Sequence, residues 1–168
     1  MGDLADLLNV PPEELERLLL ENQAALNQIL LVLAIGSALI LLLHVLFSWM
    51  LVKCGEAIPA AHRKLPPWHA WLLVIPCFNI VWNFFVYPKL AQSFRACFEA
   101  RERRDAGDCG EALGMWFSIT YAAGNLVPFL GPLFLLAAML LQLQYLVRAW
   151  RLRKELLNSA PAASGSGA

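Results

Sequence analysis

The sequence predicts an all-α protein: a four-helix transmembrane bundle with an acidic amino-terminal helix and with both termini in the cytoplasm. Of the 168 residues, 59% are hydrophobic and 15% are charged, whereas soluble domains average about 45–50% apolar and about 25% charged residues. The stretches 22–52, 65–88 and 112–147 contain no Asp, Glu, Lys or Arg, and a helix of about 20 apolar residues crosses a bilayer. The predicted divisions are an acidic amphipathic segment (1–21), a four-helix transmembrane domain (22–155) and a flexible low-complexity tail (156–168).

The amino-terminal segment holds six carboxylates against a single basic residue, Arg17. Pro12 suits the first position of a helix, and the glutamates after it lie where the helix dipole favours negative charge. The short apolar face of this helix consists of Leu15, Leu18 and Leu19. We expect the segment to pack against a neighbouring subunit or against the cytoplasmic ends of the bundle.

The first transmembrane helix is predicted from about Gln28 to Met50. Ser37, His44 and Ser48 share one of its faces, because they are spaced by whole helical turns. His44 is the one titratable group inside any predicted span. An ionisable side chain within the membrane is a functional candidate, and a neutral imidazole is also a common hydrogen-bonding group between helices. Both interpretations of His44 stay open.

Residues 53–67 are predicted to form a loop, and the second transmembrane helix follows it from about Trp68. This helix continues past Lys89 as an amphipathic arm that ends near Arg104. Pro76 removes a backbone donor from this helix and predicts a kink. A single stripe at helical spacing consists of Leu72, Pro76, Asn79, Asn83 and Tyr87. A polar stripe on a spanning helix must meet protein or water, so we expect the other helices to gather around this one.

The third and fourth helices are predicted over about 109–127 and 130–150. The helix break between them consists of Pro128, Gly131 and Pro132. A helical hairpin across the membrane and a re-entrant pair that turns back inside the bilayer both fit this pattern. Small residues recur at every fourth position of the third helix and allow close backbone approach. They are Gly110, Gly114, Ser118 and Ala122.

Seven polar residues of the first three helices form a predicted intramembrane layer. They are Ser37, His44, Asn79, Asn83, Ser118, Tyr121 and Asn125. Because an unpaired amide in hydrocarbon costs several kcal/mol, we expect the Asn79/Asn83 stripe to face Gly114 and Ser118, with His44 near Tyr121 or Asn125. In this interpretation the layer lies inside each subunit and fixes helix register. The alternative is a layer that lines a pore.

Basic residues set the predicted orientation. Four spans would place ten on one side, namely Arg17, Lys89, Arg95, Arg101, Arg103, Arg104, Arg148, Arg151, Arg153 and Lys154. Only Lys53, Arg63 and Lys64 would lie on the other side. Since cytoplasmic loops are enriched in Lys and Arg, both termini are predicted in the cytoplasm.

Three strings of the sequence carry a resemblance: LPPWHAWLLVIPCFNIVWNFFVYPKLAQSF (65–94), GDCGEALG (107–114) and VPFLG (127–131). Through them residues 56–155 resemble a group of small uncharacterised bacterial multi-pass membrane proteins. The resemblance implies a bacterial inner-membrane location. It implies no activity, substrate or catalytic residue.

Several function classes are disfavoured by the residues themselves. The 13 basic and 13 acidic residues balance, so net charge gives no reason to expect nucleic-acid binding. The four cysteines have no CxxC spacing, and we expect neither a metal site nor a cofactor. An enzyme would have to rest on Ser48 one turn from His44, and no span holds a carboxylate to orient that imidazole. No catalytic residue is therefore predicted.

The preferred hypothesis is a non-enzymatic membrane protein that acts as a homo-oligomer or as a component that binds a membrane partner. Gln142 and Gln144 support assembly, because they point to nearly opposite faces of the fourth helix and one neighbour cannot satisfy both. The alternative is an oligomeric ion or small-solute channel. Such pores usually carry rings of charge or of carbonyl groups.

Overall fold

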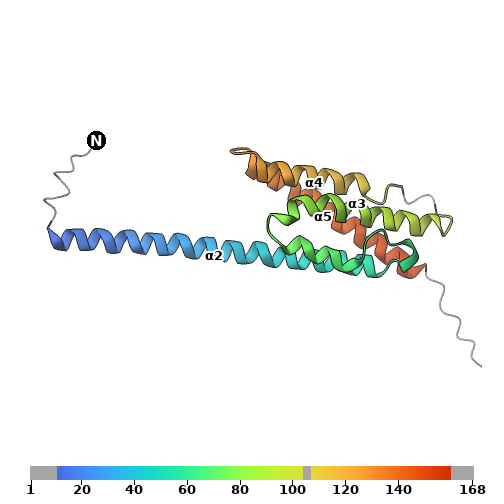
Figure 1. The fold of residues 1–168 in the computed structure, drawn as a ribbon, viewed down its shortest axis with the longest axis horizontal. Helices are drawn as coiled ribbons and strands as arrows, with labels where there is room; N and C mark the ends of the chain where they lie inside the picture. The colour runs from blue at the N-terminus through green and yellow to red at the C-terminus, as the bar shows by residue number, and fades with distance from the viewer. Residues whose placement is uncertain (1–10, 104–106, 160–168) are drawn as a thin grey trace, which may run out of the picture. The chain divides into compact units, whose positions relative to one another are not determined.

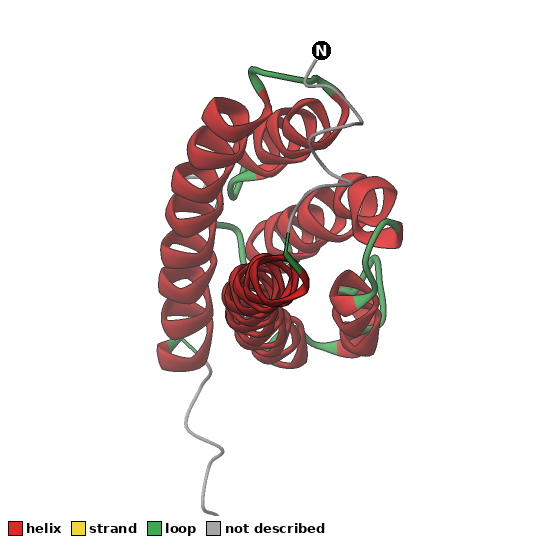
Figure 2. Cartoon of the chain, turned by 90° about the vertical axis from the view of Figure 1, so that its left-hand side faces the viewer, coloured by secondary structure: helices red, strands yellow, loops and turns green. Residues whose placement is uncertain are grey.

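The computed structural model describes residues 11–103 and 107–159, and within its first helix it leaves the side chains of Pro12, Leu15, Leu18, Leu19 and Glu21 undescribed. The predicted leucine face, the first ten residues and the end of the tail therefore lie outside the described part. The described residues are all-helical and contain no strand (Figure 2), which confirms the all-α prediction. The elements are α2 (Pro12–Glu56), η1 (Ala60–His62), η2 (Pro67–Val74), α3 (Phe78–Glu99), α4 (Glu111–Leu126) and α5 (Gly131–Asn158), where η marks a 3₁₀ helix.

The first helix, α2, runs without interruption from Pro12 to Glu56 (Figure 1). The predicted separation of an amino-terminal helix from a first transmembrane helix is therefore wrong. The reason is visible in the sequence, since residues 13–35 contain no proline or glycine that would end a helix. The chain divides into two compact units, 1–42 and 43–168, and α2 contributes residues to both.

By length and composition, two described helices could cross a membrane: Asn22–Glu56 and Gly131–Asn158. The predicted four-helix transmembrane bundle is therefore not confirmed. The third predicted span, α4, has 16 residues. At 1.5 Å per residue it is about 24 Å long, which is less than the hydrocarbon thickness of about 30 Å.

The predicted second span is broken where only a kink was expected. Helix η2 ends at Val74 and α3 begins at Phe78. Pro76 has no N–H, and Cys77 has a φ of 63°, so helical hydrogen bonding does not continue between them. The N–H of Phe78 instead donates to the carbonyl of Pro76 at 2.7 Å. The indole N–H of Trp82 donates to the backbone of η2, and the two helices form a first hairpin.

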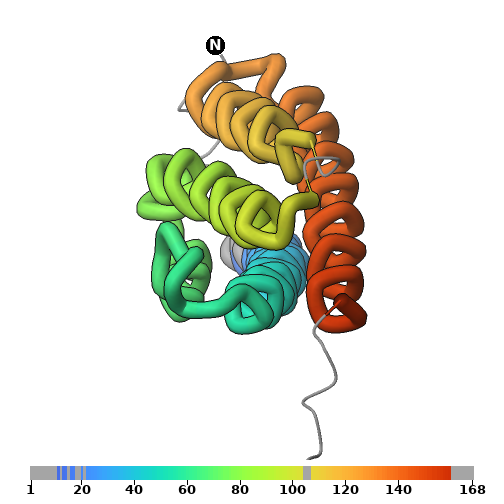
Figure 3. The backbone as a smooth tube through the Cα atoms, turned by 90° about the vertical axis from the view of Figure 1, so that its right-hand side faces the viewer, coloured from blue at the N-terminus to red at the C-terminus, as the bar shows by residue number. Residues whose placement is uncertain are grey.

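Helices α4 and α5 form a second hairpin and lie side by side (Figure 3). The chain leaves α4 at Leu126 and begins α5 at Gly131, so Pro128 lies in the turn and Gly131 and Pro132 are the first residues of α5. A side chain cannot be accommodated at Gly131, because a Cβ there would lie 2.6 Å from the carbonyl oxygen of Gly124. Helix α5 continues to Asn158, two turns beyond its predicted end.

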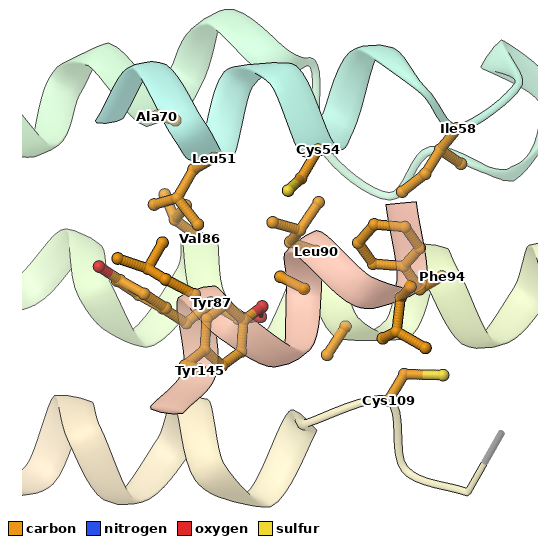
Figure 4. Packing of buried hydrophobic residues seen from close by; sticks show 14 of the residues in the cluster. Leu51, Cys54, Ile58, Ala70, Val86, Tyr87, Leu90, Phe94, Cys109 and Tyr145 are labelled. Atoms are coloured by element: carbon orange, nitrogen blue, oxygen red, sulfur yellow. Dashed lines mark hydrogen bonds between the residues drawn. The ribbon is translucent and has the colours of Figure 1, made fainter. Parts of the chain in front are cut away.

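The core of unit 43–168 is centred on α3, which contacts η1, η2, α4 and α5. Side chains from α2, α3 and α5 meet there (Figure 4). The side chains labelled in this view include Leu51 and Cys54 of α2, Ile58 just after it, Val86, Tyr87, Leu90 and Phe94 of α3, and Tyr145 of α5, and all of them are buried.

The carboxyl-terminal ends of α2 and α5 meet at one end of this unit, here named the charged end. The Nε of Arg153 donates to the carbonyl of Lys53 at 3.1 Å, and the N–H of Lys64 donates to Ser93 Oγ near the end of α3 at 2.8 Å. The four-span prediction placed Lys53 and Lys64 on the side of the membrane opposite to the other basic residues. In the structure both lysines lie at the same end as the basic residues of α3 and α5. The predicted ten-to-three division is not confirmed, because η2 and α3 form a hairpin and not one continuous helix.

Candidate functional site

The predicted polar layer is partly assembled between α3 and α4. Asn79 and Asn83 are both buried on α3, and Ser118 is buried on α4. The Nδ2 of Asn79 donates to the hydroxyl of Tyr121 at 3.1 Å. This bond links the first turn of α3 to the middle of α4, so the face predicted to carry Gly114 and Ser118 is the one that α3 meets.

Three residues of the predicted layer bond to their own helix instead of to another. The hydroxyls of Ser37 and Ser118 donate to the carbonyls of Leu33 and Gly114 at 2.7 and 2.8 Å. The amide of Asn125 donates to the carbonyl of Tyr121 at 2.8 Å, and Asn125 is exposed. Such bonds to the fourth preceding carbonyl satisfy a polar side chain inside one helix.

The outer members of the predicted layer therefore differ from the buried ones. Ser37 is exposed and belongs to unit 1–42. His44 is half-buried on α2, and its predicted position near Tyr121 or Asn125 stays a prediction. The buried part of the layer consists of Asn79, Asn83 and Ser118, with Tyr121 at its edge.

The most buried polar cluster is one that the sequence did not reveal, and it is centred on Tyr87. The hydroxyl of Tyr145 donates to the backbone carbonyl of Tyr87 at 2.7 Å, and the amide of Gln142 donates to the hydroxyl of Tyr87 at 2.8 Å. The ring centroids of the two tyrosines lie 4.9 Å apart in an edge-to-face arrangement. The available signal was the spacing of Gln142, Tyr145 and Ala149, which places all three on one face of α5.

Gly114 explains how α4 reaches this cluster. A Cβ at this position would lie 2.9 Å from the Cβ of Tyr87 and 3.0 Å from Cε2 of Tyr145. Of the other predicted packing residues, Gly110 has a φ of 91° and precedes α4, and Ala122 is half-buried. Gly114 is thus the predicted packing residue at which α4 approaches Tyr87 and Tyr145 most closely.

The amino terminus of α4 is held by Asp108. Its two carboxylate oxygens accept the N–H groups of Gly110 and Ala112, each at 3.1 Å, and Oδ1 also accepts from Arg148 at 2.9 Å. Partial burial by itself raises the pKa of Asp108, but these N–H groups and the Arg148 guanidinium outweigh it and hold the pKa below its usual value. The carboxylate therefore acts as a helix cap and joins α4 to α5.

Arginines satisfy the carbonyl groups at the ends of α2 and α5. Arg63 donates to the carbonyls of Ile58 and Glu56 at 2.7 and 3.0 Å, and Arg153 donates to Lys53. Arg101 donates to the carbonyl of Leu156 at 3.2 Å. The last carbonyls of a helix lack partners within the helix and carry partial negative charge. These three guanidinium groups therefore act as part of the fold.

The described residues hold no group of three or more His, Cys, Asp or Glu side chains that could bind a metal. Ser48 is buried, and its hydroxyl has no hydrogen-bond partner within the described part of the chain. A nucleophilic serine needs a base within hydrogen-bonding distance. The described structure therefore does not pair Ser48 with His44.

Comparisons with protein-family models, with curated proteins and with solved structures found no match to this chain. The resemblance of residues 56–155 to small bacterial membrane proteins stays a prediction.

Proposed function

We propose that this chain is a non-enzymatic integral membrane protein that crosses the bilayer through α2 and works by assembling with itself or with a partner membrane protein. The observation that carries the proposal is the exposure of α2. None of the most apolar 18-residue window in Asn22–Glu56 is buried. Large side chains along it, such as Leu30, Val32 and Leu42, are about 60–70% exposed. A row of apolar side chains this long matches hydrocarbon and does not suit water.

The orientation that we propose has the charged end in the cytoplasm and the amino terminus on the opposite side. Residues 43–168 carry twelve basic side chains against seven acidic ones, whereas residues 1–42 carry one against six. The positive-inside rule assigns the basic part to the cytoplasm. A single crossing by the uncharged stretch 22–52 then separates the two termini. The bacterial inner membrane is proposed from the resemblance of residues 56–155.

In this proposal the two hairpins enter the bilayer from the cytoplasmic face and return to it. Both hairpin turns, at 75–77 and 127–130, are opposite to the ends of α3 and α5 that carry the charges. The turn residues Ile75 and Leu130 are about half exposed, and Phe129 is fully exposed. This favours the re-entrant interpretation of residues 128–132 over a full crossing, because all the loops that join the hairpins then stay on one side.

Assembly through residues 22–42 is part of the proposal. Gly36 has no atom within 4 Å of where its Cβ would be, apart from its own helix. A second helix can approach closely at such a position. Gln142 supports assembly less than the sequence suggested, because its amide donates to the hydroxyl of Tyr87 within the same subunit. Gln144 is exposed and still lacks an assigned role.

The channel alternative has less support. An aqueous path would need polar side chains that face it, and Asn79, Asn83 and Ser118 are instead buried within one subunit. We therefore interpret the polar layer as a means of fixing the register of α3 against α4.

Cysteine labelling tests the orientation directly. Asn22 and Asn158 are both exposed, and the proposed orientation assigns them to opposite sides of the membrane. N22C and N158C can be made separately in a C77S background. A membrane-impermeant maleimide should label N22C in intact spheroplasts and N158C only after permeabilisation. Protection of both positions in intact spheroplasts would return both termini to the cytoplasm and contradict the proposal.

A further inference from the structure

The outward face of α5 changes from apolar to basic along its length. Leu136, Leu140, Leu143 and Val147 project from this face and are 42–55% exposed. Arg151 and Lys154 continue the same face and are also exposed, because 3.6 residues per turn aligns positions 136, 140, 143, 147, 151 and 154. The side of α5 that carries Tyr145 and Ala149 is buried against the core. The outward face therefore has no described protein partner.

The basic end of this face is available for an anion. Arg63, Arg101 and Arg153 are occupied by helix-end carbonyls. Arg148, beside this face, is held by Asp108. Within the described residues Arg151 makes no ion pair and no hydrogen bond. A shallow hollow lies where the apolar and basic parts meet, lined by Leu143, Gln144, Val147, Arg148 and Arg151.

We propose that this hollow binds the phosphate headgroup of an anionic phospholipid, with Arg151 at the phosphate and with the acyl chains along Val147, Leu143 and Leu140. The proposal rests on the proposed membrane function, because it needs α5 to lie at the cytoplasmic boundary of the bilayer. Val147 and Arg151 are one turn apart, about 6 Å along the axis. That step brings the charged group and the apolar surface within reach of a single lipid molecule.

The apolar half of the face decides between a lipid and free phosphate. A site for inorganic phosphate would need convergent donors, and the described hollow offers two arginines and one amide beside leucine and valine. Juxtamembrane Lys and Arg residues attract anionic headgroups at the cytoplasmic surface of a membrane. The combination of exposed leucines and adjoining arginines therefore matches a phospholipid and gives free phosphate no additional contact.

Lipid retention by the full-length chain tests the site. Protein in mild detergent is titrated with phosphatidylglycerol or phosphatidylcholine, and the bound lipids are counted by native mass spectrometry. We expect retention of phosphatidylglycerol, and a loss of its affinity of about fivefold in R151Q, the usual effect of one basic residue at an anionic surface. The matched control is K64Q, which removes one exposed charge from the charged end without touching α5.

Each outcome has a defined meaning. Loss of affinity for phosphatidylglycerol in R151Q but not in K64Q supports the site. Equal retention of both lipids, or equal affinity in R151Q and K64Q, overturns it. Displacement of phosphatidylglycerol by inorganic phosphate would also overturn the commitment to lipid. The titration is done in micelles and does not report on topology, so its failure is distinguishable from a failure of the cysteine-labelling test.

Discussion

Gly114 is a position at which α4 packs tightly against two tyrosines of the neighbouring helices. A methyl group at this position would clash with both tyrosines, because its carbon would lie 2.9 Å from Cβ of Tyr87 and 3.0 Å from Cε2 of Tyr145. Both tyrosines are fully buried and Tyr145 is bonded to the backbone of α3, so neither can move freely. Overpacking of this kind costs about 1–3 kcal/mol.

We therefore expect G114A to lower the free energy of unfolding by about 1–3 kcal/mol. G36A, measured at a detergent concentration that keeps the chain monomeric, is the matched control, because it makes the same change where nothing in the chain lies within 4 Å. In a helix interior it should be neutral or stabilising by up to about 1 kcal/mol. Thermal unfolding of both variants in detergent micelles measures the difference. Equal midpoints would contradict the close approach at Gly114.

The cysteines should differ sharply in reactivity. Cys77 is exposed in the break between η2 and α3, whereas Cys54, Cys97 and Cys109 are buried. Burial raises the pKa of Cys97 and raises that of Cys109 to about 11. A raised pKa lowers the thiolate fraction at neutral pH, and the thiolate is the reactive form.

Once mild detergent has replaced the bilayer around the 75–77 turn, we expect iodoacetamide at about pH 8, close to the pKa of an ordinary thiol, to modify Cys77 and to spare the other three cysteines. Cys109 should begin to react only as the pH approaches about 11. Peptide mass spectrometry of the native protein locates the modification, and C77S should abolish it. Modification of Cys97 or Cys109 at the lower pH would show that these thiols are not buried in solution.

Sequence periodicity predicted which residues of a helix share its buried face, but it did not predict their partners on other helices. The stripe through Asn79, Asn83 and Tyr87 follows the buried face of α3, because a spanning or buried helix turns its polar groups to protein. The partner of Asn79 could not be derived in the same way. Tyr121 is the partner of Asn79 because Gly114 lets α4 pack closely against Tyr87 and Tyr145. The rotation of one helix relative to another depends on three-dimensional packing and cannot be obtained from the periodicity of either helix.

At the scale of elements, the prolines predicted the turn at 127–130 correctly, but at 75–77 they predicted only a kink where the helix in fact ends. Pro128 and Pro132 surround a glycine, and the chain turns there as predicted. Pro76 stands alone, and a lone proline commonly leaves a kinked helix. The helix ends here because Cys77 adopts a φ of 63°. A residue with a Cβ rarely does so, and the sequence offered no sign of it.

Gly36 allows a test of assembly through α2. We expect G36L to reduce the fraction of oligomer, because its side chain would keep a second helix from approaching closely. A38L is the control. Ala38 lies two residues further on, about 200° around the helix at 3.6 residues per turn, and its side chain is exposed as well. Native mass spectra in mild detergent give the oligomer fraction. A monomeric parent chain, or equal effects of both variants, would count against assembly at Gly36.

For the whole molecule, the orientation should follow basic residues and should respond weakly to acidic ones. Glu13, Glu14 and Glu16 are exposed near the start of α2. We expect E13K/E14K/E16K to give a mixed or inverted orientation, because it adds three positive charges beside Arg17. E13Q/E14Q/E16Q should keep the parent orientation. Maleimide labelling of N22C in the C77S background measures both, and a reversal by the glutamine variant would show that acidic residues set the topology.

The whole-molecule arrangement was the least accessible to sequence reasoning. Uncharged stretches give the number of segments that could cross a membrane, and here they suggested four. They do not report whether a segment crosses or returns. Lys53, Arg63 and Lys64 were placed opposite the other basic residues because η2 and α3 were treated as one helix. The contact of Arg153 with Lys53 shows that these groups share one end.

That contact also has a consequence for biosynthesis. Its two residues are 100 positions apart, and at about 5–20 residues per second a ribosome needs about 5–20 s to pass from one to the other. During this interval α2 has been made, but the arginine that satisfies its last turn has not. In the proposed topology the first helix therefore enters the membrane and takes its orientation from its own flanking residues. Nascent chains arrested before residue 153 should already have α2 inserted, with the hairpins docking onto it only later.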